Sequence, residues 1–112
     1  NAIGLGFDTG DTTWQIYSAG TVNSKINTGI TLTRTLQAQA MEIAMFCSPN
    51  VNFINYQVTE LGTANTFSAT VTTANNLPSS TTPLNMYGYM SAGSTSTSIG
   101  ITVCGIYIET DY

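Results

Sequence analysis

The amino-acid sequence predicts an all-β chain, an antiparallel β-sandwich or jelly roll, with a barrel of similar size as the alternative. Apolar and polar residues alternate with a period of two in most segments, as they do in strands with one buried face. Turn signals rich in Gly, Asn, Asp and Pro recur about every 8–12 residues. Threonine is abundant, and its β-branched side chain favours strands without adding charge. We therefore expect a single β-sandwich domain over residues 1–112.

The alternation predicts seven or eight strands. In chain order they are 2–7, 12–19, one or two short strands within 21–36 around a turn at Asn27-Thr28-Gly29, then 37–47, 51–60, 64–73, 84–91 and 98–110. The strands 51–60 and 64–73 flank Leu61-Gly62-Thr63, and this arrangement predicts an antiparallel hairpin.

Two of these segments are less regular. Residues 37–47 also fit a helical stripe, but Met41, Ile43 and Met45 alternate and the run ends at a Ser-Pro-Asn turn signal, which favours a strand. In 98–110 the apolar phase switches near Gly105, which predicts a β-bulge or burial on both faces.

The cysteines Cys47 and Cys104 lie in apolar, strand-like runs. They allow one disulfide, but the favoured interpretation is two free thiols packed in the core, because free cysteine is among the most buried residue types.

The composition excludes several classes of function. Charged residues make up 7% of the chain, against about 25% in an ordinary soluble protein. Two basic residues beside six acidic ones cannot form the basic footprint that nucleic acids require. Histidine is absent, which excludes histidine-based catalysis and histidine-ligated metal sites. The sequence contains no apolar run of 18 residues, so it predicts no transmembrane helix. The spacing of the acidic residues does not bring two carboxylates together as a catalytic pair. We therefore expect that the protein is not an enzyme and binds no cofactor.

Aromatic residues are the candidates for ligand binding, because an aromatic face covers the apolar face of a sugar ring. The tentative glycan-binding residues are Trp14, Tyr17, Asn85, Tyr87 and Tyr89, with the Asn85 amide hydrogen-bonding to hydroxyls. Because Trp14 alternates with Ile16, a position in the core is the favoured interpretation for it. Because Tyr87 and Tyr89 alternate with methionines, a subunit interface is an equal alternative for them.

Asp8 and Asp11 flank Gly10 in a predicted turn and are weak candidates for binding calcium, which prefers oxygen ligands. The spacing of an EF-hand is absent, so the favoured interpretation is that these carboxylates cap the turn.

Three parts of the sequence resemble segments of a domain common in bacteriophage tail-fibre and virion proteins. They are the run Ile3-Gly4-Leu5-Gly6-Phe7-Asp8 with its continuation through Trp14 to Lys25-Ile26-Asn27-Thr28-Gly29, the turn after Met45-Phe46-Cys47, and the closing Gly105-Ile106-Tyr107-Ile108-Glu109-Thr110-Asp111-Tyr112. The chain departs from the pattern at Asn27, where an acid is usual, and at both cysteines.

The resemblance implies a lectin-like β-sandwich at the C-terminal part of a longer virion protein. It further implies a homotrimer that contacts other virion proteins, lies on the virion surface and attaches to host glycans. It carries over no catalytic residues. A carbohydrate-binding module of a secreted protein and a purely architectural capsid or fibre decoration remain the alternatives.

Overall fold

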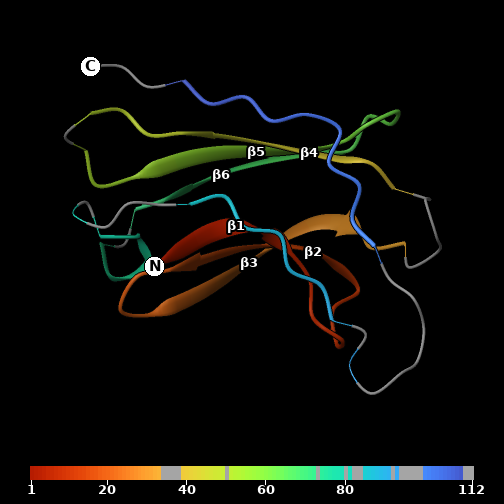
Figure 1. The fold of residues 1–112 in the computed structure, drawn as a ribbon, viewed down its shortest axis with the longest axis horizontal. Helices are drawn as coiled ribbons and strands as arrows, with labels where there is room; N and C mark the ends of the chain where they lie inside the picture. Colours follow the sequence, from red (N-terminus) through yellow and green to blue (C-terminus); the bar gives the residue numbers. More distant parts are fainter. Residues whose placement is uncertain are drawn as a thin grey trace.

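The computed structural model describes residues 1–33, 39–49, 51–72, 74–79, 81, 85–91, 93 and 100–109. Within these residues the chain is all-β, with two three-stranded antiparallel sheets of strand order β1-β2-β3 and β4-β5-β6 (Figure 1). The strands are β1 (Ala2–Gly6), β2 (Thr13–Ala19), β3 (Asn23–Thr31), β4 (Met41–Phe46), β5 (Ile54–Glu60) and β6 (Thr66–Val71). A turn of 3-10 helix, η1 (Ala74–Asn76), follows β6. No helix in the described ranges is long and apolar enough to cross a membrane.

The β1-β2-β3 sheet differs from the sequence prediction at one point. The prediction of a turn at Asn27-Thr28-Gly29 is wrong, because β3 continues through these residues. Gly29 has a φ of 73° and donates its N–H to Asn27 Oδ1 at 2.7 Å, while the Thr28 hydroxyl donates to the Trp14 carbonyl at 2.8 Å. The left-handed glycine lies opposite a register shift in β2, so it is accommodated as a bulge within the strand.

The β4-β5-β6 sheet agrees with the predicted pattern. Residues 41–46 form a strand, so the helical alternative for this segment is excluded. β5 and β6 form the predicted hairpin, in which Tyr56 lies opposite Ala69 and Val58 opposite Phe67. Gly62 in the connecting turn has a φ of 83°, a conformation that glycine adopts without a steric cost.

The two sheets share one apolar core. Figure 1 shows β4-β5-β6 above β1-β2-β3, and β3 and β6 lie in contact. The buried apolar residues come from both sheets: Ile16, Ile30, Tyr56, Val58 and Val71. Each belongs to the inward-facing set of its strand, so the period-two alternation sets which residues form the core.

Gln39 adds a polar link between the sheets. Its Oε1 accepts from Trp14 Nε1 at 3.0 Å, and its Nε2 donates to the Thr31 carbonyl at 2.7 Å and to Glu60 Oε1 at 2.8 Å. One partly buried side chain therefore joins β2 and β3 to the end of β5.

The C-terminal part differs most from the prediction. The described residues of the expected strands 84–91 and 98–110 contain no strand, and six strands rather than seven or eight are present in the described part of the chain. Most of their large apolar side chains are exposed, including Tyr87, Tyr89, Ile106 and Tyr107. Alternation indicates a tendency to form extended backbone, but a strand also needs a neighbouring edge, and the described residues of these two segments pair with none.

The prediction of buried cysteines is also wrong. Cys47 and Cys104 are free and exposed, because one follows the end of β4 and the other lies in the unpaired C-terminal segment. Parts of the sequence predictions lie outside the described residues: positions 34–38, 50, 73, 80, 82–84, 92, 94–99 and 110–112.

Gly20→Ala tests how closely the segment after β6 packs against the end of β2. A Cβ atom at Gly20 would overlap the carbonyl oxygens of Leu77 and Asn75. We expect Gly20→Ala to lower the free energy of unfolding by about 1–3 kcal/mol, the usual cost of overpacking. The measurement is equilibrium urea denaturation.

Gly4→Ala is the matched control, because nothing lies within 4 Å of a Cβ at that strand position. We expect it to be neutral or to stabilise by about 0.5–1 kcal/mol, since alanine loses less backbone entropy than glycine on folding. Equal stability of the two variants would contradict the close approach at Gly20.

Candidate functional site

The outward face of the β4-β5-β6 sheet carries the candidate site. Strand register places Phe46, Asn55 and Thr70 in one row and Ala44, Gln57 and Ser68 in the next. These residues alternate with the inward-facing core set, so their side chains lie on the opposite face of the sheet. The same alternation that forms the core therefore gathers amides, hydroxyls and one aromatic ring on this surface.

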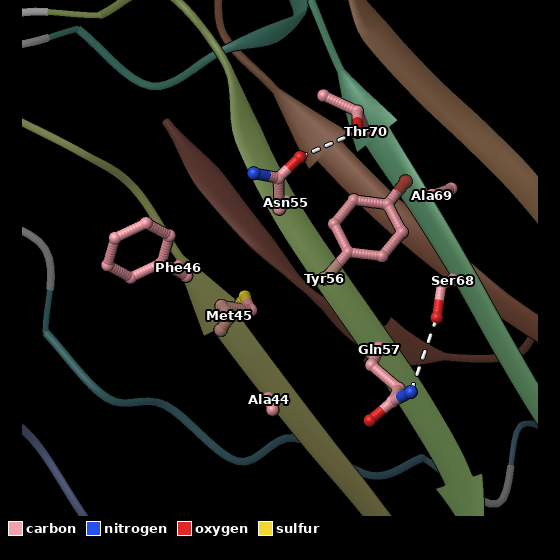
Figure 2. Close-up of a pocket in the computed structure, with 9 residues that line it drawn as sticks. All are labelled: Ala44, Met45, Phe46, Asn55, Tyr56, Gln57, Ser68, Ala69 and Thr70. Atoms are coloured by element: carbon pink, nitrogen blue, oxygen red, sulfur yellow. Dashed lines mark hydrogen bonds between the residues drawn. The ribbon is translucent and has the colours of Figure 1, made fainter.

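This face is hollowed. The hollow has a volume of about 470 Å³, and Figure 2 shows its lining residues: Ala44, Met45, Phe46, Asn55, Tyr56, Gln57, Ser68, Ala69 and Thr70. Three consecutive residues from each strand contribute, so the floor is the sheet itself. Tyr56 is buried, and its side chain belongs to the core rather than to the open surface.

Hydrogen bonds between the strands orient the polar side chains. The Thr70 hydroxyl donates to Asn55 Oδ1 at 2.6 Å, and Gln57 Nε2 donates to Ser68 Oγ at 3.4 Å. Figure 2 shows the other end of each amide, the nitrogen of Asn55 and the oxygen of Gln57, directed toward the β4 side of the hollow. A donor and an acceptor are thus presented next to each other.

Phe46 supplies the aromatic surface at the β4 side of the hollow, and its side chain is 59% exposed. None of the nine lining residues carries a formal charge. Glu42, two residues before Ala44 on β4, is the nearest acid along that strand. The hollow therefore combines an exposed ring with neutral hydrogen-bonding groups. That combination suits an uncharged polyhydroxylated ligand.

Asp8, Asp11, Tyr17 and Lys25 form a separate charged cluster, where β3 meets the turn between β1 and β2. Lys25 Nζ lies 2.7 Å from Asp11 Oδ1 and 3.2 Å from Asp8 Oδ2. The Tyr17 hydroxyl donates to Asp8 Oδ2 at 3.0 Å, and Lys25 Nζ lies 5.4 Å from the centre of the Tyr17 ring. An ammonium group thus lies against the two carboxylates that the sequence suggested as calcium ligands.

The electrostatics of this cluster follow from the ion pairs. The hydrogen bond from Lys25, followed by that from the Asp8 backbone N–H, holds the pKa of Asp11 below its usual range. Asp11 in turn is the main cause that raises the pKa of Lys25. Burial raises the pKa of the Tyr17 hydroxyl. In the described part of the chain, no group of three or more Cys, Asp or Glu side chains is placed to hold a metal ion.

The structure does not bring the predicted glycan-binding residues together. Trp14 is partly buried, with its ring edge-to-face against Phe7 at 5.1 Å between centroids, and it packs on the core. Tyr17 belongs to the charged cluster. Asn85, Tyr87 and Tyr89 are exposed in the unpaired segment 85–91, where the two tyrosine rings stack at 6.3 Å between centroids. Glycan binding by each of these residues stays a prediction.

Sequence reasoning did not single out the residues of the hollow as a site. The period-two alternation within 51–60 and 64–73 puts Asn55, Gln57, Ser68 and Thr70 on the polar faces of these strands, and all four are exposed in the structure. The signal in the sequence is a pair of consecutive strands in which the outward residues of one are amides and those of the next are hydroxyl-bearing residues. Phe46 lies in an apolar run with Met45 and Cys47, and only its alternation with Met45 indicates that it faces the other side of the sheet.

Comparison with known proteins found no match: no family model, no curated protein and no solved structure resembles this chain significantly.

Lys25→Met tests the charged cluster. We expect it to raise the pKa of Asp11 toward the ordinary value of 3.8, because the main group that stabilises the carboxylate is removed. A carboxyl group whose pKa is lower in the folded than in the unfolded state stabilises the fold at pH values above its unfolded-state pKa. This contribution is lost as the pH falls through the folded-state pKa. The variant should therefore lose less stability than the wild type on acidification below about pH 4. The measurement is an NMR titration of the side-chain carboxyl carbons.

Lys25→Arg is the control, because it keeps a cation against Asp11 and should preserve the lowered pKa. An Asp11 pKa that is the same in the Lys25→Met variant and the wild type would show that the ion pair does not form in solution.

Proposed function

We propose that this chain is a β-sandwich or jelly-roll domain of a bacteriophage tail fibre or related virion appendage that attaches to neutral glycans on a host surface. It would lie on the virion surface as a homo-oligomer, a trimer by the sequence resemblance, in contact with other virion proteins. It would act by binding and not by catalysis, without a cofactor.

The neutral hollow on the outward face of β4-β5-β6 is the observation that carries this proposal. A sugar ring presents an apolar face for stacking and hydroxyls that both donate and accept. Phe46 matches the first, and the outward ends of the Asn55 and Gln57 amides match the second. A charged ligand would find no counter-ion among the lining residues.

Three observations support the virion context. The sequence resemblance runs from the β1-β2 region to the C-terminal segment, and the charge content of 7% suits surfaces that pack against copies of themselves. The exposed apolar residues of 85–91 and 100–109 are further surface that an assembly would cover.

The purely architectural module is the second candidate. It is favoured by the same exposed apolar segments, which indicate subunit contacts whether or not the hollow binds a ligand. A carbohydrate-binding module of a secreted protein would share the hollow but would function as a monomer. Glycan binding and oligomeric state together separate the three possibilities.

Phe46→Ala and Gln57→Ala test the hollow. Using an array of neutral and acidic oligosaccharides followed by titration calorimetry on the strongest neutral binder, we expect each variant to weaken binding about tenfold, equivalent to about 1.4 kcal/mol. Neutral sugars should bind in preference to acidic ones, and the unfolding midpoint should change little because both side chains are exposed.

Thr59→Ala is a matched control on the outward face of β5, outside the lining residues, and should bind as the wild type does. Tyr87→Ala tests the site that the sequence suggested. If Tyr87→Ala abolished binding while Phe46→Ala left it unchanged, the glycan site would lie in segment 85–91. If no oligosaccharide bound the wild type, the architectural function would be favoured.

A further inference from the structure

Segment 100–109 has strand-like side-chain spacing but no strand partner. Its apolar residues fall on both faces, with Ile101 and Val103 in one phase and Cys104, Ile106 and Ile108 in the other. All described residues of the segment are exposed, and Tyr107 reaches 84%. Residues 100–108 carry no charge, so no formal charge opposes their burial.

This two-sided pattern differs from that of the paired strands. β5 and β6 have apolar residues on the inward face and polar ones on the outward face, as expected when one face meets the core and the other meets water. A strand that is apolar on both faces requires cover from both sides. The outward-facing residues of β4-β5-β6 around the hollow are exposed, so no described element covers that face, and a single chain supplies apolar cover on one side only.

β4 is an edge strand of its sheet and has one side open to a further strand. β4 pairs with β5 on one side, and no described strand pairs with the other. Met45, on its inward face, is 47% exposed, although Tyr56 beside it on β5 is buried. β6, the strand at the opposite edge, lies in contact with β3 of the other sheet.

We propose that segment 100–109 of a second copy of this chain adds as a strand to the free edge of β4. Main-chain groups of the segment would pair with the unpaired groups of β4, as in other cases of β-strand addition. Cys104, Ile106 and Ile108 would extend the inward layer beside Ile43 and Met45. Ile101 and Val103, the apolar residues of the other phase, would then contact the neighbouring subunit.

The added strand would also complete the hollow. With Ile106 and Ile108 inward, alternation places Tyr107 on the outward face, the same face as Phe46. The Tyr107 hydroxyl donates to Glu109 Oε2 at 2.8 Å, so these two side chains already lie on one side of the extended segment. The second copy would supply an aromatic wall on the open β4 side of the hollow. This inference rests on the oligomeric part of the proposed function and does not require that sugars bind.

Disulfide trapping in the full chain tests the proposal. Three variants carry Cys47→Ser, keep the native Cys104, and add one cysteine on the inward face of β4 by Met41→Cys, Ile43→Cys or Met45→Cys. Alternate residues of a strand lie about 6.6 Å apart, and cysteines with Cα atoms more than about 7 Å apart cannot be bridged without backbone movement. We therefore expect oxidation to give intermolecular links, seen on non-reducing gels, at one of the three positions far above the other two.

Two controls set the background. Cys47→Ser alone measures links between Cys104 residues, and Cys47→Ser with Ala69→Cys places the new cysteine on β6, at the opposite edge of the sheet. Both should give few linked species. Light scattering before oxidation should show the same oligomer for all variants and for the wild type.

Each other outcome overturns the proposal. A link within one chain would show that the segment closes its own sheet. An oligomer without β4-specific links would leave the homo-oligomer of the proposed function intact and place its interface elsewhere. A monomer would overturn both. As an independent measurement, Ile106→Asp should reduce the oligomer to monomers, whereas Val22→Asp, at an exposed position on the other sheet's loop, should not. An oligomer that survived Ile106→Asp would contradict the proposal.

Discussion

The packing of two inward-facing apolar layers is the interaction on which the rest of this structure depends. Ile16 and Ile30 from one sheet meet Tyr56, Val58 and Val71 from the other. Burying a large apolar side chain contributes about 1.5–3 kcal/mol relative to leaving it exposed, so each of these residues stabilises the contact between the sheets. Because side chains alternate along a strand, fixing this layer also fixes the opposite face of every strand.

The candidate site is a consequence of that constraint. Once Tyr56 and Val58 face the core, Asn55 and Gln57 must face outward. Strand register then places them between β4, which contributes Phe46 and Ala44, and the hydroxyls of β6. Around the hollow this face carries Thr, Ser, Asn and Gln and no charged residue. The surface is therefore polar enough to be hydrated and neutral enough to bind uncharged hydroxyl groups at a low desolvation cost.

Sequence reasoning succeeded where the information is local. The alternation in 41–46 and 54–60 identified the strands and their faces, because period two is a property of each strand by itself. It failed at Gly29, because the same positive-φ glycine serves a turn or a bulge and the register of the partner strand decides between them. It also could not locate the hollow or the Gln39 bridge, since both depend on which strands are neighbours and with what offset.

The C-terminal segments extend this argument from one chain to an assembly. Their sequence has the spacing and β-propensity of strands, yet extended backbone in water gains little without an edge to pair with and an apolar layer to cover. A residue such as Met45 is half exposed on a face that its neighbours bury, so the core ends at β4 before its apolar surface does. The exposed inward side of β4 at Met45 and the unpaired segment 100–109 are both apolar, and residues 100–108 carry no charge. Completion of one chain's core by another would satisfy both, and it would make stability depend on subunit concentration.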